Sequence, residues 1–218
     1  ADRSPLLRIR AAHRATALAE HFRDQGKNVL LIMDSLTRVA HARREIGLAL
    51  GEQPTAKGYP ASVMSLIPAL VERAGMGDTT SGGSITGIYT VLADGDDTND
   101  PVVDSARAIL DGHVVLSRAN AQLGIYPAVD IQASISRVMN DIVDAKHLTA
   151  ARRLRQLISL YMENRDLMLM GGYAEGQDDD LDQAVKLWPK IVEFISQRPD
   201  SPADFNSSLR ALLAITGA

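Results

Sequence analysis

The chain has 218 residues, with 23 Lys and Arg against 27 Asp and Glu, a formal net charge of −4 and 45% hydrophobic residues. These values predict one large α/β domain, or a domain with a small appendage, and exclude a chain that is disordered throughout. The absence of cysteine excludes disulfides, thiolate metal sites and cysteine nucleophiles. No stretch approaches the roughly 20 uncharged apolar residues of a membrane span and no secretory signal layout opens the chain, so we expect a soluble protein.

The first predicted elements are a helix and a strand. Ser4 and Pro5 read as a helix N-cap and first helical position, and apolar residues from Leu7 to Phe22 recur at steps of three and four until Gly26. The apolar run over 28–34 shows no alternation, which is typical of a parallel strand covered by helices on both faces.

Further elements follow in chain order. The patterns predict a helix over 35–50, a polar loop over 51–60, a helix over 62–74, a strand over 84–93, a helix over 101–110 and a strand over 113–117. From His147 the pattern is helical to the end of the chain. We therefore expect an α/β domain with a mostly parallel sheet flanked by helices over 1–145, followed by an all-α region over 146–218.

Asp34 closes the first predicted strand. The carboxyl edge of a parallel sheet is where ligands bind in open α/β folds, so this carboxylate is placed to hold Mg²⁺ through water beside a nucleotide's phosphates. An aspartate between a strand and a helix can equally cap the helix that begins at Ser35. The strand alone leaves both interpretations open.

Four sequence blocks occur in a fixed order: VLLIMDSLTR over 29–38, GEQPTAKGYP over 51–60, LDGHVVLSR over 110–118 and YPAVDIQASISR over 126–137. The first resembles the Walker B strand of hexameric ATPases with a RecA-like core. Together the blocks resemble the ATPases that energise flagellar protein export and type III secretion, which are relatives of the rotary ATP synthase catalytic subunits. The similarity runs from Ser4 to about Ile195 and implies a RecA-like sheet.

The resemblance assigns roles to individual residues. Asp34 becomes the magnesium-facing Walker B acid, and Arg38 lies near the γ-phosphate and the catalytic carboxylate. Arg137 becomes an arginine finger that reaches the neighbouring subunit's nucleotide, a role worth about 10³ to 10⁵ in rate. Tyr126, followed by the rigid Pro127, matches the tyrosine that stacks on adenine. Without this context, Arg38 and Arg137 read as surface residues and Tyr126 as a core or turn residue.

Two acidic clusters and the histidines have simpler interpretations. The run over 94–100 lacks the glycine and glutamate of an EF-hand, so we predict a turn and a helix N-terminus, which the resemblance places toward the central channel of a hexamer. The second cluster is predicted to supply N-terminal charges to a helix beginning near Leu181; it comprises Glu175, Asp178, Asp179, Asp180 and Asp182. The five histidines share no metal-ligand spacing.

No Gly-x-x-x-x-Gly-Lys-[Ser/Thr] phosphate-binding loop occurs in the sequence. In the resembled family this loop and the glutamate that polarises the attacking water lie upstream of the segment that matches Ala1, and Glu45 and Glu52 do not replace that glutamate. We therefore expect a fragment of a longer ATPase that by itself binds nucleotide weakly and hydrolyses ATP negligibly.

The resemblance also implies ATP and Mg²⁺ as ligands, a homohexamer, and a cytoplasmic location at the inner face of the membrane export apparatus, peripheral to the membrane through partners only. The implied partners are export chaperones, secretion substrates, and stator and central-stalk proteins. Met162, Met168 and Met170 are either core residues or an adaptable surface for such partners.

Two other functions stay open on the sequence. One is an RNA or DNA translocase of the terminator-helicase type, which has a similar Walker B block. The acidic balance, 4% aromatic residues and a basic cluster confined to 152–155 count against it, so no nucleic acid is expected. The other is a non-catalytic subunit of a rotary ATPase. Flagellar and injectisome systems are not distinguished.

Overall fold

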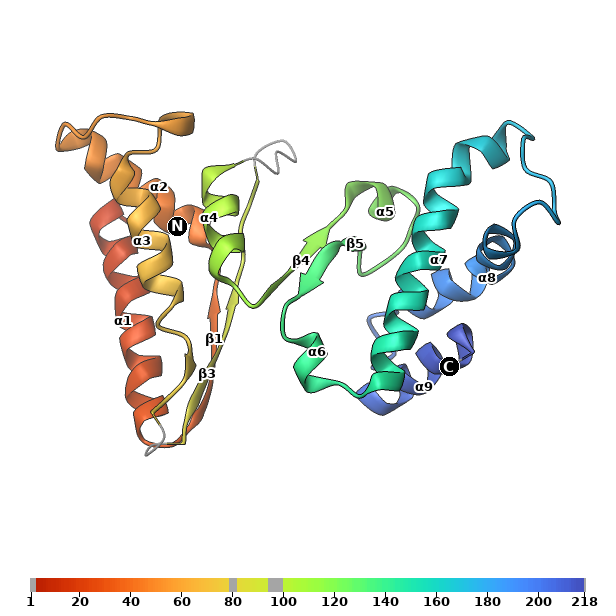
Figure 1. Ribbon diagram of the computed structural model, residues 1–218. Helices are drawn as coiled ribbons and strands as arrows, with labels where there is room; N and C mark the ends of the chain where they lie inside the picture. Colours follow the sequence, from red (N-terminus) through yellow and green to blue (C-terminus); the bar gives the residue numbers. More distant parts are fainter. Residues whose placement is uncertain (1–2, 79–81, 94–99, 218) are drawn as a thin grey trace. The chain divides into compact units, whose positions relative to one another are not determined.

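The computed structural model describes residues 3–78, 82–93 and 100–217. The chain divides into two compact units, Ala1–Leu110 and Asp111–Ala218. Figure 1 shows both, coloured along the sequence. Within the described ranges, no helix combines the length and apolar character that crossing a membrane requires.

The first unit contains a small mixed sheet and four α-helices within its described residues. Its elements are α1 (Pro5–Asp24), β1 (Asn28–Met33), α2 (Leu36–Ala49), the 3₁₀ turn η1 (Ala56–Gly58), α3 (Ala61–Val71), β2 (Gly75–Met76), β3 (Ser84–Tyr89) and α4 (Pro101–Ile109). The strand order is β1-β3-β2, with β1 parallel to β3 and β2 antiparallel to it. The predicted helices and strands are confirmed, with ends that differ by a few residues.

The prediction that β1 is covered on both faces is wrong for this unit. Leu31 and Met33 are buried, whereas Leu30 and Ile32 are 60% and 63% exposed. Helices cover one face of the sheet, and no described element of the unit covers the other. An apolar run without alternation therefore indicates that both sides of the strand are apolar, but it does not show that both are covered. In this unit only one side of β1 is buried.

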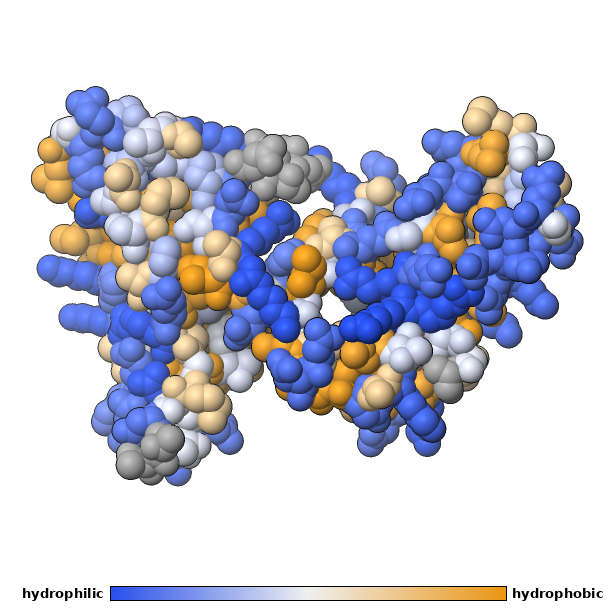
Figure 2. Space-filling view, in the orientation of Figure 1, coloured by the Kyte–Doolittle hydropathy of each residue, from blue (hydrophilic) through white to orange (hydrophobic). Residues whose placement is uncertain are grey.

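The helix α1 is confirmed, but its apolar stripe does not face the core. Leu7, Leu18 and Phe22 are 43% to 57% exposed, whereas the buried positions are Ala12, Thr16 and Ala19. These small side chains allow α1 to lie close to the sheet, and the Thr16 hydroxyl donates to the Ala12 carbonyl at 3.0 Å. Hydrophobic side chains reach the surface in both units (Figure 2).

The core of the first unit lies between the covered face of the sheet and α2, α3 and α4. Leu36, Val63, Ile67, Leu70 and Val102 are fully buried there. Because Leu36 is the first residue of α2, the core fixes the start of this helix directly after β1. The turn between β1 and α2 is thereby held in place.

The second unit contains a hairpin and a helical bundle. Its elements are β4 (Gly112–Leu116), α5 (Arg118–Gln122), β5 (Val129–Ser136), α6 (Met139–Ile142), α7 (Ala145–Leu169), α8 (Asp179–Ile195) and α9 (Phe205–Thr216). β4 and β5 are antiparallel. The core of α7, α8 and α9 includes Ala150, Leu157, Ala184, Ile191 and Leu212. Met162 packs against this core, whereas Met170 is 78% exposed, so the methionines do not form one surface.

Aspartates begin several of these helices. Asp100 accepts hydrogen bonds from the backbone of Val102 and Val103 and caps α4, as the sequence predicts, whereas 94–99 lie outside the described residues. Asp178 caps α8, which begins two residues before the predicted Leu181. Asp182 accepts a hydrogen bond of 2.7 Å from the Tyr173 hydroxyl, which raises the pKa of Tyr173 to about 12. Asp178 therefore serves the helix start, whereas Asp182 fixes the segment that precedes it.

The predicted boundary near residue 145 coincides with the first residue of α7. The compact units divide earlier, between Leu110 and Asp111, because the β4–β5 hairpin is grouped with the helices that follow it. A domain over 1–145 stays a prediction.

Candidate functional site

Asp34 lies at the carboxyl end of β1, directly after Met33, and its side chain is exposed. The Thr90 hydroxyl, just beyond β3, donates to Asp34 Oδ1 at 2.8 Å. The parallel register that pairs Met33 with Tyr89 brings these two residues to the same edge of the sheet. The hydrogen bond orients the carboxylate and leaves it open to solvent.

Ser35, not Asp34, caps α2. Ser35 Oγ accepts a hydrogen bond from the Arg38 backbone N–H at 3.3 Å, and Ser35 is only 2% exposed. The alternative in which Asp34 merely caps this helix is therefore wrong. The capping serine satisfies the helix N-terminus and frees the neighbouring carboxylate for another use.

Further hydrogen bonds join the β1–α2 turn to the end of β3. The Leu36 N–H donates to the Thr90 carbonyl at 2.9 Å, and the Leu92 N–H donates to Thr37 Oγ1 at 2.9 Å. The Asp34–Ser35 peptide bond is cis. The ends of two parallel strands therefore form one connected edge that carries Asp34.

The donor set at this edge suits Mg²⁺ bound through water. Mg²⁺ favours oxygen ligands, retains several waters and is often held in proteins by one or two carboxylates together with substrate phosphates. Asp34 offers one exposed, oriented carboxylate, and in the described part of the chain no cluster of three or more His, Cys, Asp or Glu side chains forms a complete metal cage. A water-mediated contact to a metal–nucleotide complex fits this arrangement.

Arg38 lies one helical turn beyond Asp34, on α2, and is exposed. The Arg38 backbone N–H donates to Ser35 Oγ, which fixes the backbone of Arg38 in the first turn of α2. Asp34 and Arg38 therefore both belong to the segment of the first unit in which β1 passes into α2.

Tyr126 and Pro127 lie in the second unit, in the turn between α5 and β5, and are joined by a cis peptide bond. The Gln197 N–H, at the end of α8, donates to the Tyr126 carbonyl at 2.7 Å. Tyr126 is 57% exposed. This contact holds the turn against the chain that leaves α8.

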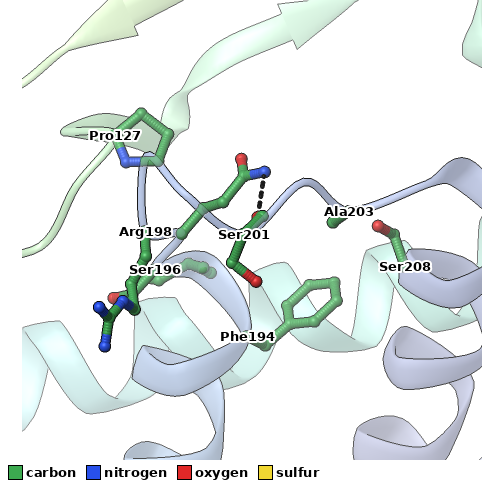
Figure 3. Close-up of a pocket in the computed structure, with 9 residues that line it drawn as sticks. Pro127, Phe194, Ser196, Arg198, Ser201, Ala203 and Ser208 are labelled. Carbon is green, nitrogen blue, oxygen red and sulfur yellow. Dashed lines mark hydrogen bonds between the residues drawn. The ribbon is translucent and has the colours of Figure 1, made fainter.

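A cavity of about 370 Å³ lies beside this turn and is lined by Pro127, Phe194, Ile195, Ser196, Gln197, Arg198, Ser201, Ala203 and Ser208. In the view of Figure 3, Ser201 lies between Pro127 and the ring of Phe194. Gln197 Nε2 donates to the Ser201 carbonyl at 3.1 Å. The Tyr126 side chain is not among the lining residues, whereas Pro127 is.

This cavity combines an aromatic ring and a proline with hydroxyl and backbone groups. Such a lining suits a flat heterocycle, which contacts apolar walls with its faces and forms hydrogen bonds at its edge. Phe194, Gln197 and Ser201 carry no motif that distinguishes them in the sequence. They reach Pro127 only because α8 ends beside it.

Arg137 follows β5 and is exposed, and its backbone N–H donates to the Asp111 carbonyl at 2.7 Å. This bond fixes the backbone at the end of the β4–β5 hairpin. Arg137, Tyr126 and Pro127 thus lie in the second unit, whereas Asp34 and Arg38 lie in the first.

The family follows from two matches along the chain. A family model described as ATP synthase alpha/beta family, nucleotide-binding domain, matches residues 1–136, and a model of the T3SS EscN ATPase C-terminal domain matches residues 143–214. The chain belongs to the ATP synthase alpha/beta family.

Individual relatives point to a branch of this family. The flagellum-specific ATP synthase of Salmonella typhimurium is 57% identical over 212 residues, which are 97% of this chain and 46% of that protein. The assembled ATPase EscN of the enteropathogenic E. coli type III secretion system matches with a TM-score of 0.94 and 46% identity, over 99% of this chain and 52% of that one.

EscN in complex with its central stalk EscO matches with a TM-score of 0.88 and 45% identity, over 99% of this chain and 51% of that one. The chain therefore spans about half the length of the proteins that it matches. The predicted resemblance to flagellar and type III secretion ATPases is confirmed, as is the α/β fold followed by a helical region.

Proposed function

We propose that this chain is part of an ATPase that couples ATP hydrolysis to protein export in a flagellar or type III secretion system. The observation that carries the proposal is the exposed Asp34 carboxylate, oriented by Thr90 at the carboxyl edge of two parallel strands. Membership of the ATP synthase alpha/beta family supports it.

Asp34 is proposed to hold Mg²⁺ through water, and Arg38 to lie near the γ-phosphate. When bound, Mg²⁺ neutralises charge that develops on the β- and γ-phosphate oxygens. Thr90 keeps the carboxylate directed outward by its hydrogen bond to Oδ1, so that little rearrangement is needed when the nucleotide arrives.

Arg137 is proposed to act as an arginine finger on the nucleotide of a neighbouring subunit in a homohexamer. A guanidinium is permanently charged and planar, and it stabilises charge on the transferred phosphoryl group. The exposed position of Arg137, after a hairpin whose backbone is fixed by Asp111, supports a role outside its own unit.

The cavity beside Pro127 is proposed to take the adenine, with Tyr126 at its border. The hydrogen bond from the Gln197 N–H to the Tyr126 carbonyl couples this border to the end of α8. The aromatic ring of Phe194 and the proline supply apolar surface for the base.

The proposal includes export chaperones and secretion substrates as partners, together with stator and central-stalk proteins. A location in the cytoplasm, at the inner face of the membrane export apparatus and attached through partners only, follows from this function. The complex of EscN with its central stalk supports a stalk partner for the related chain.

The test is a chimera in which this chain replaces the matching segment of the Salmonella typhimurium relative. We expect the chimera to hydrolyse ATP and the 218-residue chain alone to hydrolyse it negligibly. Arg137→Ala in the chimera should lower turnover by about 10³-fold or more with nucleotide binding largely intact, because the finger acts on charge that develops during transfer. Asp34→Asn should also abolish turnover.

Mixing the two inactive variants tests whether the residues act across an interface. Some interfaces in mixed rings join an intact Asp34 to an intact Arg137 of the adjacent subunit, so part of the activity should return. Arg210→Ala, which removes an exposed arginine on α9, is the control and should retain activity. Full activity of Arg137→Ala would contradict the role of Arg137 as an arginine finger. Robust ATP turnover by the 218-residue chain alone would contradict the prediction that hydrolysis requires the longer protein.

A further inference from the structure

A second cavity, of about 230 Å³, lies in the unit Asp111–Ala218. Its walls come from α7, from α8 and from the turn after α5. The lining includes Leu123 and Ile125 of the turn, Tyr161, Met162 and Arg165 of α7, and Trp188 of α8. It shares no lining residue with the cavity beside Pro127.

One wall of this cavity is a preformed aromatic surface. The rings of Tyr161 and Trp188 are stacked, with their centroids 3.8 Å apart and their planes 6° from parallel. Both residues pack against the core of α7, α8 and α9. Because the two rings cover each other's facing sides and both pack against the core, the pair is fixed in place, and its remaining ring atoms form an apolar wall at little cost in side-chain entropy.

Arg165 is the only charged residue among those that line the cavity. The other lining residues are apolar or aromatic, so no lining carboxylate neutralises it. Among the described residues, the Arg165 guanidinium has no hydrogen-bond or ion-pair partner. A planar cation at the border of an apolar cavity complements a planar carboxylate, which it can bind through two parallel hydrogen bonds.

The size of the cavity limits the ligand. Sites for drug-sized molecules have volumes of about 300 to 1,000 Å³. A volume of about 230 Å³ suits one fused ring system with a short acidic group and is too small for a nucleotide.

We propose that this cavity is a second binding site, which takes a small planar aromatic carboxylate with its ring beside the stacked pair of Tyr161 and Trp188 and its acid group on Arg165. The site does not depend on the proposed ATPase function. Its ligand class follows from the aromatic wall, the single cation and the volume.

Trp188 makes the test direct, because the chain contains one tryptophan and so gives a single indole N–H signal in a ¹⁵N–¹H correlation spectrum. The full 218-residue chain is titrated with 2-naphthoate and, separately, with the neutral 2-naphthamide. We expect 2-naphthoate to shift the indole signal with a Kd of about 0.1 to 1 mM, and the amide to bind several-fold more weakly.

Arg165→Gln should weaken 2-naphthoate binding about tenfold and remove the preference for the acid over the amide. Arg165→Lys should recover part of the affinity. It keeps the positive charge, but an ammonium group cannot form the two parallel hydrogen bonds that a guanidinium forms with a carboxylate. Arg210→Gln on α9 removes an arginine that does not line the cavity and should change nothing. An unchanged indole signal in the ligand-free variants verifies that the fold is intact.

Three results would overturn the proposal: no indole shift at millimolar 2-naphthoate, equal binding of the acid and the amide, or equal effects of Arg165→Gln and Arg210→Gln. The first excludes the cavity as a site for this ligand class. The other two exclude the role of the cation.

Discussion

Two serine hydroxyls in the first unit have opposite surroundings. Ser35 Oγ caps α2 by accepting from the Arg38 N–H. Ser62 Oγ is buried near the start of α3 and has no hydrogen-bond partner among the described residues. A serine hydroxyl therefore forms a stabilising hydrogen bond at position 35 and lacks a hydrogen-bond partner at position 62.

We expect Ser35→Ala to lower the free energy of unfolding by about 1 kcal/mol, the usual cost of losing an N-cap. Ser62→Ala should cost nothing or stabilise slightly, because it removes a buried polar atom without breaking a bond. Urea unfolding of both variants measures the difference. An equal loss in both would contradict the capping role.

The site was only partly predictable from single residues. Asp34 was identified from its position after an apolar strand, and the structure places it at the expected edge, oriented and exposed. Its partner Thr90 is 56 residues away and depends on the register of β1 with β3, which no local pattern encodes. Phe194 and Gln197 were missed for the same reason.

At the scale of elements, an ion pair joins α1 to the residues after α3. Arg73 Nε donates to Glu20 Oε1 at 2.8 Å, and Arg73 Nη2 bonds to Oε2 of the same carboxylate. The hydrogen bonds from Arg73 lower the pKa of Glu20, and the same contact raises the pKa of Arg73. The pair fixes the end of α1 beside β2.

We expect Glu20→Gln to lower the free energy of unfolding by about 0.5 to 1 kcal/mol at neutral pH, the upper range for a well-oriented, partly exposed pair. Since folding lowers the pKa of Glu20, the stabilisation is complete above its ordinary value of about 4.3 and is lost as the pH falls through the folded value. Unfolding of both proteins between pH 7 and strongly acidic pH is the measurement.

The two stability curves should therefore converge in acid. Glu193→Gln, at an exposed position on α8, is the control and should leave the stability at neutral pH unchanged. A difference for Glu20→Gln that stays constant down to low pH would show that the ionised carboxylate is not what stabilises the fold.

The helices were predicted better than the strands, for a physical reason. Caps such as Asp100 and Asp178 are local signals, so helix starts can be located from a few residues. β5 was not predicted as a strand because half of its residues are polar, and in the structure all eight lie at partly or fully exposed positions. Its pairing with β4 stabilises it, and pairing is not a local property.

At the scale of the whole molecule, each unit has its own core, and that of the second unit can be monitored through Trp188. Leu157 is fully buried among α7, α8 and α9, whereas Leu169 on the same helix is 76% exposed. Leu157→Ala should lower the free energy of unfolding of this unit by about 2 to 5 kcal/mol, and Leu169→Ala by less than about 0.5 kcal/mol. Tryptophan fluorescence during urea unfolding measures both, and similar losses would contradict the assigned core.

The residues assigned to catalysis are divided between the two units, with Asp34 in one and Arg137 in the other. The sequence prediction differs, because the expected domain over 1–145 contains both residues and the compact units divide between Leu110 and Asp111. Under the proposed function, Arg137 acts on the nucleotide of a neighbouring subunit, so its role can be tested only in the assembled ring.

Among the described residues, β1 is the outer strand of its sheet and pairs on one side only, with β3. Successive residues of a strand direct their peptide groups to alternate sides. Amide protons that point toward β3 should therefore exchange slowly with deuterated solvent, and those between them should exchange quickly. A strand that paired along this edge would slow the fast set alone, so the alternation along six residues reports whether the sheet has been extended.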